Sequence, residues 1–314
     1  MITFDTIRAA HDRIRPHIHH TPVLTNQTLD DRTGASLFFK CENFQKIGAF
    51  KARGGLNAVL QVVDSKAGKA VATHSSGNHA QAVAYAARQV GLPAYIVMPR
   101  TAPQVKKDAV RGYGAEVIEC EPTQAAREAG VQAVIDETGA VLVHPYDDEW
   151  VIAGQATAAI ELITDAGQLP FDIILTPVGG GGLLSGTALA THFLSPMTRV
   201  IGCEPEGAAD AVLSFRSGQV ESAPYIDTIA DGLMARLSDR TLGYIRQHVS
   251  AILTVPDADI IAAMRLVWER MKIIIEPSCA VTLAVVLRYP DQFAGKKVGI
   301  ILTGGNVDLG KLPF

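Results

Sequence analysis

The chain has 314 residues, of which 48% are hydrophobic and 19% charged, so it can bury a sizeable core and is long enough for about two domains. Its formal net charge of −4 comes with no basic block that could neutralise phosphates, which argues against nucleic acid or an anionic membrane as a partner. No apolar run approaches the roughly 20 residues that span a bilayer. Residues 1–16 are charged and do not resemble a signal peptide.

The chain contains four widely spaced cysteines, which mostly lie in apolar runs: Cys41, Cys120, Cys203 and Cys279. This spacing predicts buried thiols in a reducing compartment, and neither a disulfide framework nor a zinc site. We therefore expect a cytoplasmic protein.

Short β-rich runs alternate with helical stretches along the chain. The first group comprises strands over 70–74, 94–99, 115–120 and 140–145, with helices over 78–91 and 103–114. The second comprises strands over 171–178, 199–205 and 296–305, with a helix over 258–272. Such alternation predicts parallel sheets covered by helices on both faces. We expect an α/β fold in which a small domain, residues 70–146, is inserted into a large domain made of residues 1–69 and 147–314.

Lys51 lies in the stretch FQKIGAFKARGG, among small, apolar and glycine residues. Desolvation in such a setting lowers the pKa of an amine and makes it a nucleophile that can form a Schiff base. The alternative interpretation is a lysine at a helix start that extends its charged end to solvent.

Four glycine-containing loops follow predicted strands: SSGNH (75–79), GGGG (179–182), EPEGAAD (204–210) and TGGNVD (303–308). In open α/β sheets, ligands bind at the carboxyl ends of the strands. One such loop could be simple turn chemistry, but four together predict a ligand site.

The loop VGGGGLLSG is the candidate phosphate site, because glycines let the backbone approach an anion and the next helix presents free N–H groups. A flexible turn and a dinucleotide fold are the alternatives. Gly180, Gly182 and Gly186 resemble a dinucleotide fingerprint, but the third glycine is out of register. A reactive lysine with a phosphate loop favours pyridoxal phosphate (PLP) over the nicotinamide cofactor of an oxidoreductase.

Six segments occur in the order found in the fold-type II PLP enzymes: FQKIGAFKARGGLNAV, HSSGNHAQAVAYAA, VGGGGLLSG, TIADGL, LVWERMKIIIEPS and LTGGNVDLG. The resemblance spans nearly the whole chain, and it is strongest to serine racemases and to serine/threonine and 3-hydroxyaspartate ammonia-lyases. It implies a tryptophan synthase β-like fold with two open, twisted, mostly parallel sheets that carry helices on both faces. It also implies a homodimer.

The same resemblance implies roles for the residues around the cofactor. Lys51 would carry PLP as a Schiff base and act as the base on one face, with Phe50 packed on the ring. Asn78 would hold the 3′ oxygen of the cofactor, and Thr303 would face the pyridine nitrogen. The cofactor phosphate would be bound by Gly179, Gly180, Gly181 and Gly182.

The resemblance further implies a substrate loop and a cation site. The loop residues Ser75, Ser76, Gly77, Asn78 and His79 would receive the substrate carboxylate, and Ser76 would be a second acid/base. Hard oxygen ligands for Mg²⁺, Ca²⁺ or Mn²⁺ would come from Glu204, the Ala208 carbonyl and Asp210. His144 and Arg127 are either contacts of the substrate side chain or a structural histidine and a surface arginine.

These observations predict a PLP-dependent ammonia-lyase that converts a small β-hydroxy amino acid to a 2-oxo acid and ammonia. The alternative is a serine racemase with dehydration as a side reaction, and a non-enzyme alternative is a ligand-binding regulator that retains the cofactor loops. The chain has Ala49 and Cys279 where the family commonly has serine and glycine. These departures leave the substrate open among serine, threonine, 3-hydroxyaspartate and bulkier 3-hydroxy amino acids.

Overall fold

The computed structural model describes residues 1–167 and 170–314. By packing, the chain divides into two compact units: unit 1 comprises Met1–Ile18 and Lys51–Gly154, and unit 2 comprises His19–Phe50 and Gln155–Phe314. The predicted small domain, 70–146, lies within unit 1, which also takes in residues 1–18, 51–69 and 147–154. The domain boundaries taken from the sequence stay a prediction.

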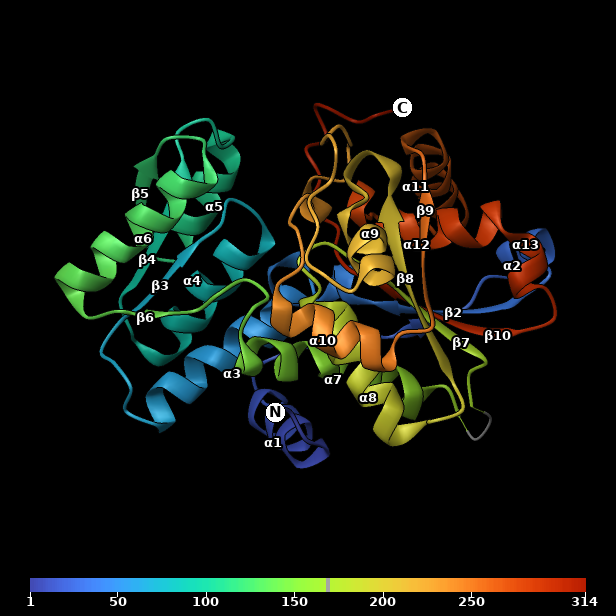
Figure 1. Cartoon of the computed structure of the whole chain (residues 1–314), viewed down its shortest axis with the longest axis horizontal. Helices are drawn as coiled ribbons and strands as arrows, with labels where there is room; N and C mark the ends of the chain where they lie inside the picture. The colour runs from blue at the N-terminus through green and yellow to red at the C-terminus, as the bar shows by residue number, and fades with distance from the viewer. Residues whose placement is uncertain (168–169) are drawn as a thin grey trace. The chain divides into compact units, whose positions relative to one another are not determined.

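Unit 1 is built on a four-stranded parallel sheet in the order β5-β4-β3-β6 (Figure 1). Its strands are β3 (Val71–His74), β4 (Ala94–Pro99), β5 (Glu116–Cys120) and β6 (Val141–Leu142). Its helices are α1 (Phe4–Ile14), α3 (Lys51–Asp64), α4 (Asn78–Val90), α5 (Gln104–Gly112) and α6 (Gln124–Thr138). Helix α7 (Glu149–Asp165) begins in unit 1 and continues in unit 2.

Alternating side chains of β3 and β4 enter two different cores, because successive residues of a strand point to opposite faces. Val71, Ile96 and Met98 belong to the core that contains residues of α3, α4 and α5. Ala72 and Val97 belong to the core that contains residues of α6. The sheet is therefore covered on both faces, as the alternation of elements predicted.

The strand predicted over 140–145 is shorter in the structure, where β6 ends at Leu142. The Val143 N–H still donates to the Ala72 carbonyl at 2.8 Å, but beyond it the chain turns away. Pro145 has no N–H to donate to a sheet, and the His144 ring accepts the amide of Asp147. Local side-chain bonding thus ends the strand and starts a loop.

Within the described residues, unit 2 contains a six-stranded sheet in the order β1-β2-β10-β7-β8-β9, in which only β1 is antiparallel. The strands are β1 (Val23–Leu24), β2 (Ser36–Cys41), β7 (Ile173–Pro177), β8 (Arg199–Pro205), β9 (Ala251–Val255) and β10 (Lys297–Leu302). The α-helices are α2 (Gln27–Thr33), α8 (Gly182–Leu194), α9 (Asp210–Ser217), α10 (Asp239–His248), α11 (Asp257–Met271), α12 (Pro277–Arg288) and α13 (Pro290–Phe293). Short 3-10 turns are η1 (Glu42–Phe44), η2 (Lys46–Gly48), η3 (Glu206–Ala208) and η4 (Asp231–Leu233).

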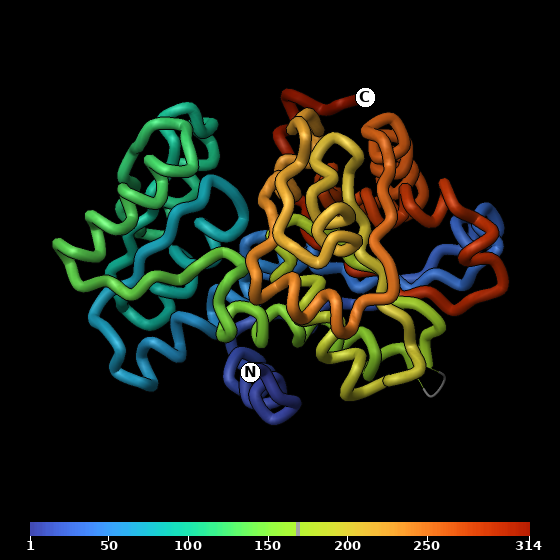
Figure 2. Tube along the Cα trace, in the orientation of Figure 1, coloured from blue at the N-terminus to red at the C-terminus, as the bar shows by residue number. Residues whose placement is uncertain are grey.

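The unit 2 sheet joins segments from both ends of the chain. Figure 2 shows β10, near the C-terminus, beside the early strand β2, and the two strands pair in parallel along their whole length. Inward residues of β2, β7 and β10 pack with α11 and α12, and residues of the opposite face pack with α7 and α8.

Unit 2 also buries a lysine with charged partners. Lys40 on β2 is fully buried and pairs with Glu161 of α7 at 2.7 Å, and its amine donates to the Thr21 carbonyl at 2.6 Å. A buried ammonium requires such partners because its desolvation is costly.

Among the described residues, no helix combines the length and the apolar character needed to cross a bilayer.

Candidate active site

Lys51 is the first residue of α3, and its side chain is partly buried. Its amine donates a hydrogen bond to the Pro145 carbonyl at 2.7 Å. Burial lowers the pKa of Lys51 to about 8. The carbonyl carries no net charge, so it orients the amine while giving less support to the charged form than a carboxylate would. The role of this amine as the nucleophile stays a prediction.

The loop Ser75–Gly77 connects β3 to α4, where the strand ends and the helix begins. Gly77 precedes the first residue of α4, and no side chain caps this helix. The first turn of an uncapped helix has N–H groups directed outward, and these favour an anion. Ser76 and Asn78 are partly exposed here. The structure therefore brings the predicted carboxylate-binding residues together within unit 1.

His79, also in this region, is a buried neutral imidazole. Its Nε2 lies 3.0 Å from the Val143 carbonyl, and because a carbonyl only accepts, Nε2 carries the proton. Its Nδ1 is buried and has no hydrogen-bond partner. Burial, with a further contribution from the charge of Lys51, holds the pKa of His79 well below its usual range.

His144 and Arg127 lie close to His74, which ends β3. The ring of His144 meets that of His74 edge-on, with centroids 5.5 Å apart. Burial lowers the pKa of His74, and the charge of Arg127 lowers it further. The Nε of Arg127 is buried and has no hydrogen-bond partner. Arg127 as a whole is partly exposed, so both interpretations of it, a substrate contact and a surface arginine, stay predictions.

In unit 2, the glycine loop lies between β7 and α8. Gly181 has the left-handed φ of 87°, and a Cβ there would lie 2.7 Å from the Leu237 side chain. A Cβ on Gly179 would lie 3.0 Å from the Leu233 Cα. Both glycines are required by the segment packed behind them, and Gly181 is also required by its backbone conformation. No side chain caps α8, whose first N–H groups can therefore receive a phosphate.

Thr303 follows β10 and is buried. Its carbonyl accepts the N–H of Phe50 at 2.9 Å, so these two predicted cofactor residues meet within unit 2. Burial raises the pKa of the Cys279 thiol, and the nearby Thr303 offsets part of that rise. Ala49 is fully buried and forms a bridge with Gly304.

The predicted cation ligands lie at the end of β8 and the start of α9. Both carboxylate oxygens of Glu204 accept backbone N–H groups, from Ala211 at 2.7 Å and Val212 at 3.0 Å. Burial raises the pKa of Glu204 to about 8 and that of Asp210 to about 6. The Oδ2 of Asp210 is buried and has no hydrogen-bond partner.

A buried, unpartnered carboxylate oxygen beside a second carboxylate fits a hard cation. In residues 1–167 and 170–314, however, no three His, Cys, Asp or Glu side chains gather as a metal-binding group. The predicted set supplies only two carboxylates, and Ala208 would contribute its carbonyl.

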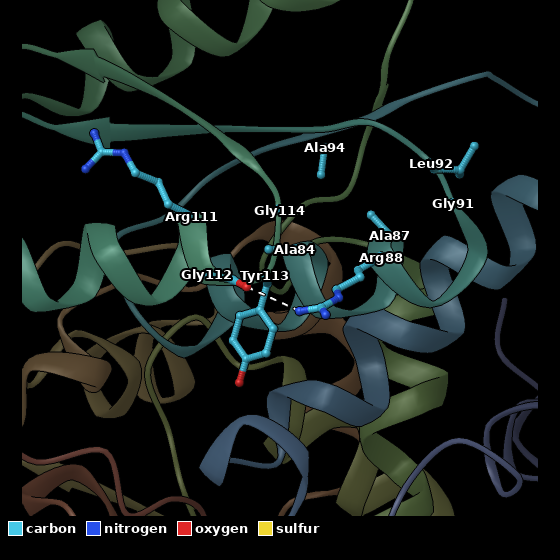
Figure 3. A pocket seen from close by; sticks show the side chains of 10 residues that line it. All are labelled: Ala84, Ala87, Arg88, Gly91, Leu92, Ala94, Arg111, Gly112, Tyr113 and Gly114. Carbon is cyan, nitrogen blue, oxygen red and sulfur yellow. Dashed lines mark hydrogen bonds between the residues drawn. The ribbon is translucent and has the colours of Figure 1, made fainter.

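A cavity of about 420 Å³ lies elsewhere in unit 1, beside α4 and α5 (Figure 3). Arg88 crosses it to donate to the Gly112 carbonyl at 3.2 Å. None of the predicted site residues lines it. We therefore do not assign the chemistry of Lys51 to this cavity.

Comparison with known proteins places the chain in a family. The family described as "Pyridoxal-phosphate dependent enzyme" matches residues 14–304. The chain belongs to the pyridoxal-phosphate-dependent enzymes. This membership decides between PLP and a dinucleotide cofactor in favour of PLP, and it confirms the predicted fold class.

Individual relatives cover nearly the full length. The β-hydroxyaspartate dehydratase of Paracoccus denitrificans is 53% identical over 312 residues, which is 99% of this chain and 98% of that protein. The L-threo-3-hydroxyaspartate ammonia-lyase of Saccharomyces cerevisiae is 46% identical, over 98% of this chain and 94% of that protein. The crystal structure of serine racemase from Dictyostelium discoideum superposes with a TM-score of 0.93 at 47% identity, over 98% and 99% of the two chains.

These names agree with the activities expected from the sequence. Ammonia-lyase and dehydratase relatives confirm the predicted class of PLP-dependent lyase, and the racemase relative corresponds to the predicted alternative.

Sequence reasoning missed the role of Pro145, whose carbonyl is the acceptor for Lys51. A main-chain acceptor leaves no mark of its own in a sequence.

Proposed function

We propose that this chain is a PLP-dependent ammonia-lyase acting on a 3-hydroxyaspartate-type amino acid, which it converts to a 2-oxo acid and ammonia. The observation that carries the proposal is the partly buried Lys51, with a pKa lowered to about 8 and an amine held by the Pro145 carbonyl. Amino-acid racemisation is a second activity, which Ser76 favours.

The cofactor would be held by residues that satisfy its separate chemical groups. Lys51 would form the covalent link, Phe50 would pack on the ring, and Asn78 and Thr303 would bond its polar edge atoms. The loop of Gly179, Gly180, Gly181 and Gly182, with the uncapped start of α8, suits the phosphate. When bound, PLP supplies an electron sink for the charge left on the α-carbon.

This chain's own residues would then handle the substrate. The uncapped start of α4, with Ser75, Ser76 and Gly77, would bind the α-carboxylate. Lys51 would remove the α-proton from one face, and the β-hydroxyl would take up a proton and leave as water. Water would then hydrolyse the released enamine to the 2-oxo acid and ammonia. His79 is held neutral by burial, so it would not place a second positive charge beside Lys51.

Arg127 supports the proposal that the substrate carries a second carboxylate. Its buried Nε lacks an acceptor, and His74, which lies near it, has a lowered pKa and stays uncharged at neutral pH. A carboxylate accepts charge-assisted hydrogen bonds from a guanidinium. Serine and threonine have no group that could satisfy Arg127 in this way.

We also propose a divalent cation, Mg²⁺ or else Ca²⁺ or Mn²⁺, bound by Glu204, Asp210 and the Ala208 carbonyl. The unpartnered Asp210 oxygen and the raised pKa values of both buried acids support it, because a cation would relieve their desolvation.

We further propose a homodimer in the cytoplasm. Free thiols at Cys41, Cys203 and Cys279, all buried, support a reducing compartment.

The first prediction concerns the cofactor lysine. Lys51→Ala should abolish ammonia release from every β-hydroxy amino acid tested, because both the covalent link and the base are lost. Borohydride reduction of the wild-type protein should attach the cofactor permanently to Lys51, as mass spectrometry of its peptides would show, and should attach none in the variant. Near-native ammonia release by Lys51→Ala would refute the proposed function.

The second prediction concerns substrate class. An ammonia-release screen would cover serine, threonine and both β-epimers of 3-hydroxyaspartate. The highest kcat/KM should be found with 3-hydroxyaspartate. Arg127→Met should lower that value about ten- to a hundredfold, as expected for a lost charge-assisted hydrogen bond, and leave serine nearly unchanged. Arg111→Met, at an exposed arginine of α5, is the matched control. An equal loss for serine and 3-hydroxyaspartate would contradict the role of Arg127.

The third prediction concerns the cation. Excess Mg²⁺ should stabilise the chelator-treated protein, by about 2.7 kcal/mol at a hundredfold excess over Kd. Asp210→Asn should lose this thermal shift, whereas Glu206→Gln, at a more exposed acid of the neighbouring turn, should keep it. A wild-type melting temperature that does not change with Mg²⁺, Ca²⁺ or Mn²⁺ would contradict the proposed cation site.

The fourth prediction concerns Ser76. Racemisation requires a proton to leave one face of the α-carbon and return on the other, which one lysine cannot do. Wild-type protein incubated with L-serine in D₂O should form deuterated D-serine, more slowly than it releases ammonia from its preferred substrate. Ser76→Ala should lose this product and retain much of the elimination from L-substrates. If the wild-type protein forms no D-serine, Ser76 has no acid/base role.

A further inference from the structure

The peptide unit that joins Pro145 to Tyr146 is held on both sides. Its carbonyl accepts the Lys51 amine at 2.7 Å, and its N–H lies 3.4 Å from the His144 Nδ1. The chain has no cis peptide bond in its described part, so this carbonyl and this N–H point in opposite directions. A side chain that restrains the N–H therefore also aims the carbonyl.

His144 is suited to that restraint. Its Nδ1 also accepts the Asp147 N–H at 2.9 Å, so Nδ1 receives two donors and carries no proton itself. Burial lowers the pKa of His144 to about 4, so the ring remains a neutral acceptor near neutral pH. The rings of His74 and Tyr146 meet it edge-on, with centroids at 5.5 and 4.7 Å.

The far end of the same loop is anchored independently. Asp148 accepts the N–H groups of Trp150 and Val151 at 2.7 and 3.1 Å, which starts α7. The loop 144–148 is thus tied down by a side chain at each end, with the acceptor for Lys51 between them. An acceptor held in this way is preorganised.

We propose that His144 is a positioning residue for Lys51. It fixes the Pro145 carbonyl as the acceptor to which the Lys51 amine returns whenever that amine is not joined to the cofactor. The inference rests on the proposed role of Lys51. It also assigns the Nδ1 of His144 to the protein's own backbone and not to the substrate side chain.

The test exploits the position of the acceptor atom. In His144→Asn the amide oxygen takes nearly the place of Nδ1, whereas in His144→Gln the acceptor is one methylene further out, and His144→Ala has none. Thr123→Ala is the matched control, because it removes a different side-chain bond to a backbone N–H in the same unit, at the start of α6. Each variant is assayed for kcat and KM on the preferred substrate.

A second readout does not depend on turnover. The full chain is freed of cofactor and PLP is added, and the return of visible absorbance reports capture by Lys51. His144→Ala should lower both kcat and the rate of PLP capture by about tenfold or more, because a small displacement of a reacting group lowers its rate strongly. KM should change less than about twofold. His144→Asn should recover most of both rates, His144→Gln should not, and Thr123→Ala should match the wild type.

Other outcomes would overturn the proposal. Unchanged rates in all three His144 variants would show that the ring does not position the lysine. Equal loss in Asn, Gln and Ala variants, or a raised KM with intact kcat and capture, would assign His144 to a structural or substrate-binding role. Failure of the proposed function is separate, because it would appear as ammonia release by Lys51→Ala.

Discussion

Parallel pairing of the strands is the constraint on which the rest of the structure depends. All strands of a parallel sheet end at one edge, so the loops that follow them gather there. In unit 1 this edge receives the Ser75–Gly77 loop after β3 and the His144 loop after β6. In unit 2 it receives the glycine loop after β7, Glu204 at the end of β8 and Thr303 after β10. Residues distant in sequence become neighbours in each unit for this one reason.

Burial then sets the chemistry of the side chains at those edges. Desolvation disfavours charge of either sign, so it lowers the pKa of Lys51 and raises those of Glu204 and Asp210. Main-chain groups are the hydrogen-bond partners of two of these side chains: Lys51 donates to a carbonyl, and Glu204 accepts amide N–H groups. Lys40 is the contrast, since its partner is the buried carboxylate of Glu161. The Lys40 amine thus has a carboxylate partner, whereas the Lys51 amine donates to a carbonyl without net charge.

The two departures from the family pattern find a structural setting in unit 2. Ala49 is fully buried and forms an isolated β-bridge with Gly304, and the Cys279 thiol lies near enough to Thr303 to feel it electrostatically. Both changes therefore lie next to Thr303 or its neighbour, the region proposed to hold the cofactor ring.

The sequence by itself determined the alternation of strands and helices, the glycine loops and the order of the family motifs, because these are local patterns of residue type. It also singled out Lys51, whose apolar neighbours are adjacent in the chain. The residue pattern did not predict β2 and β9, and it predicted too long a strand for β6. The reason is that a strand's limits depend on its pairing partners and on local side-chain bonds. Only the tertiary structure decided that Pro145, 94 residues from Lys51, supplies the acceptor, and that the Arg127 Nε is buried without a partner. Burial and main-chain acceptors arise from contacts between distant segments, and no residue's identity records them.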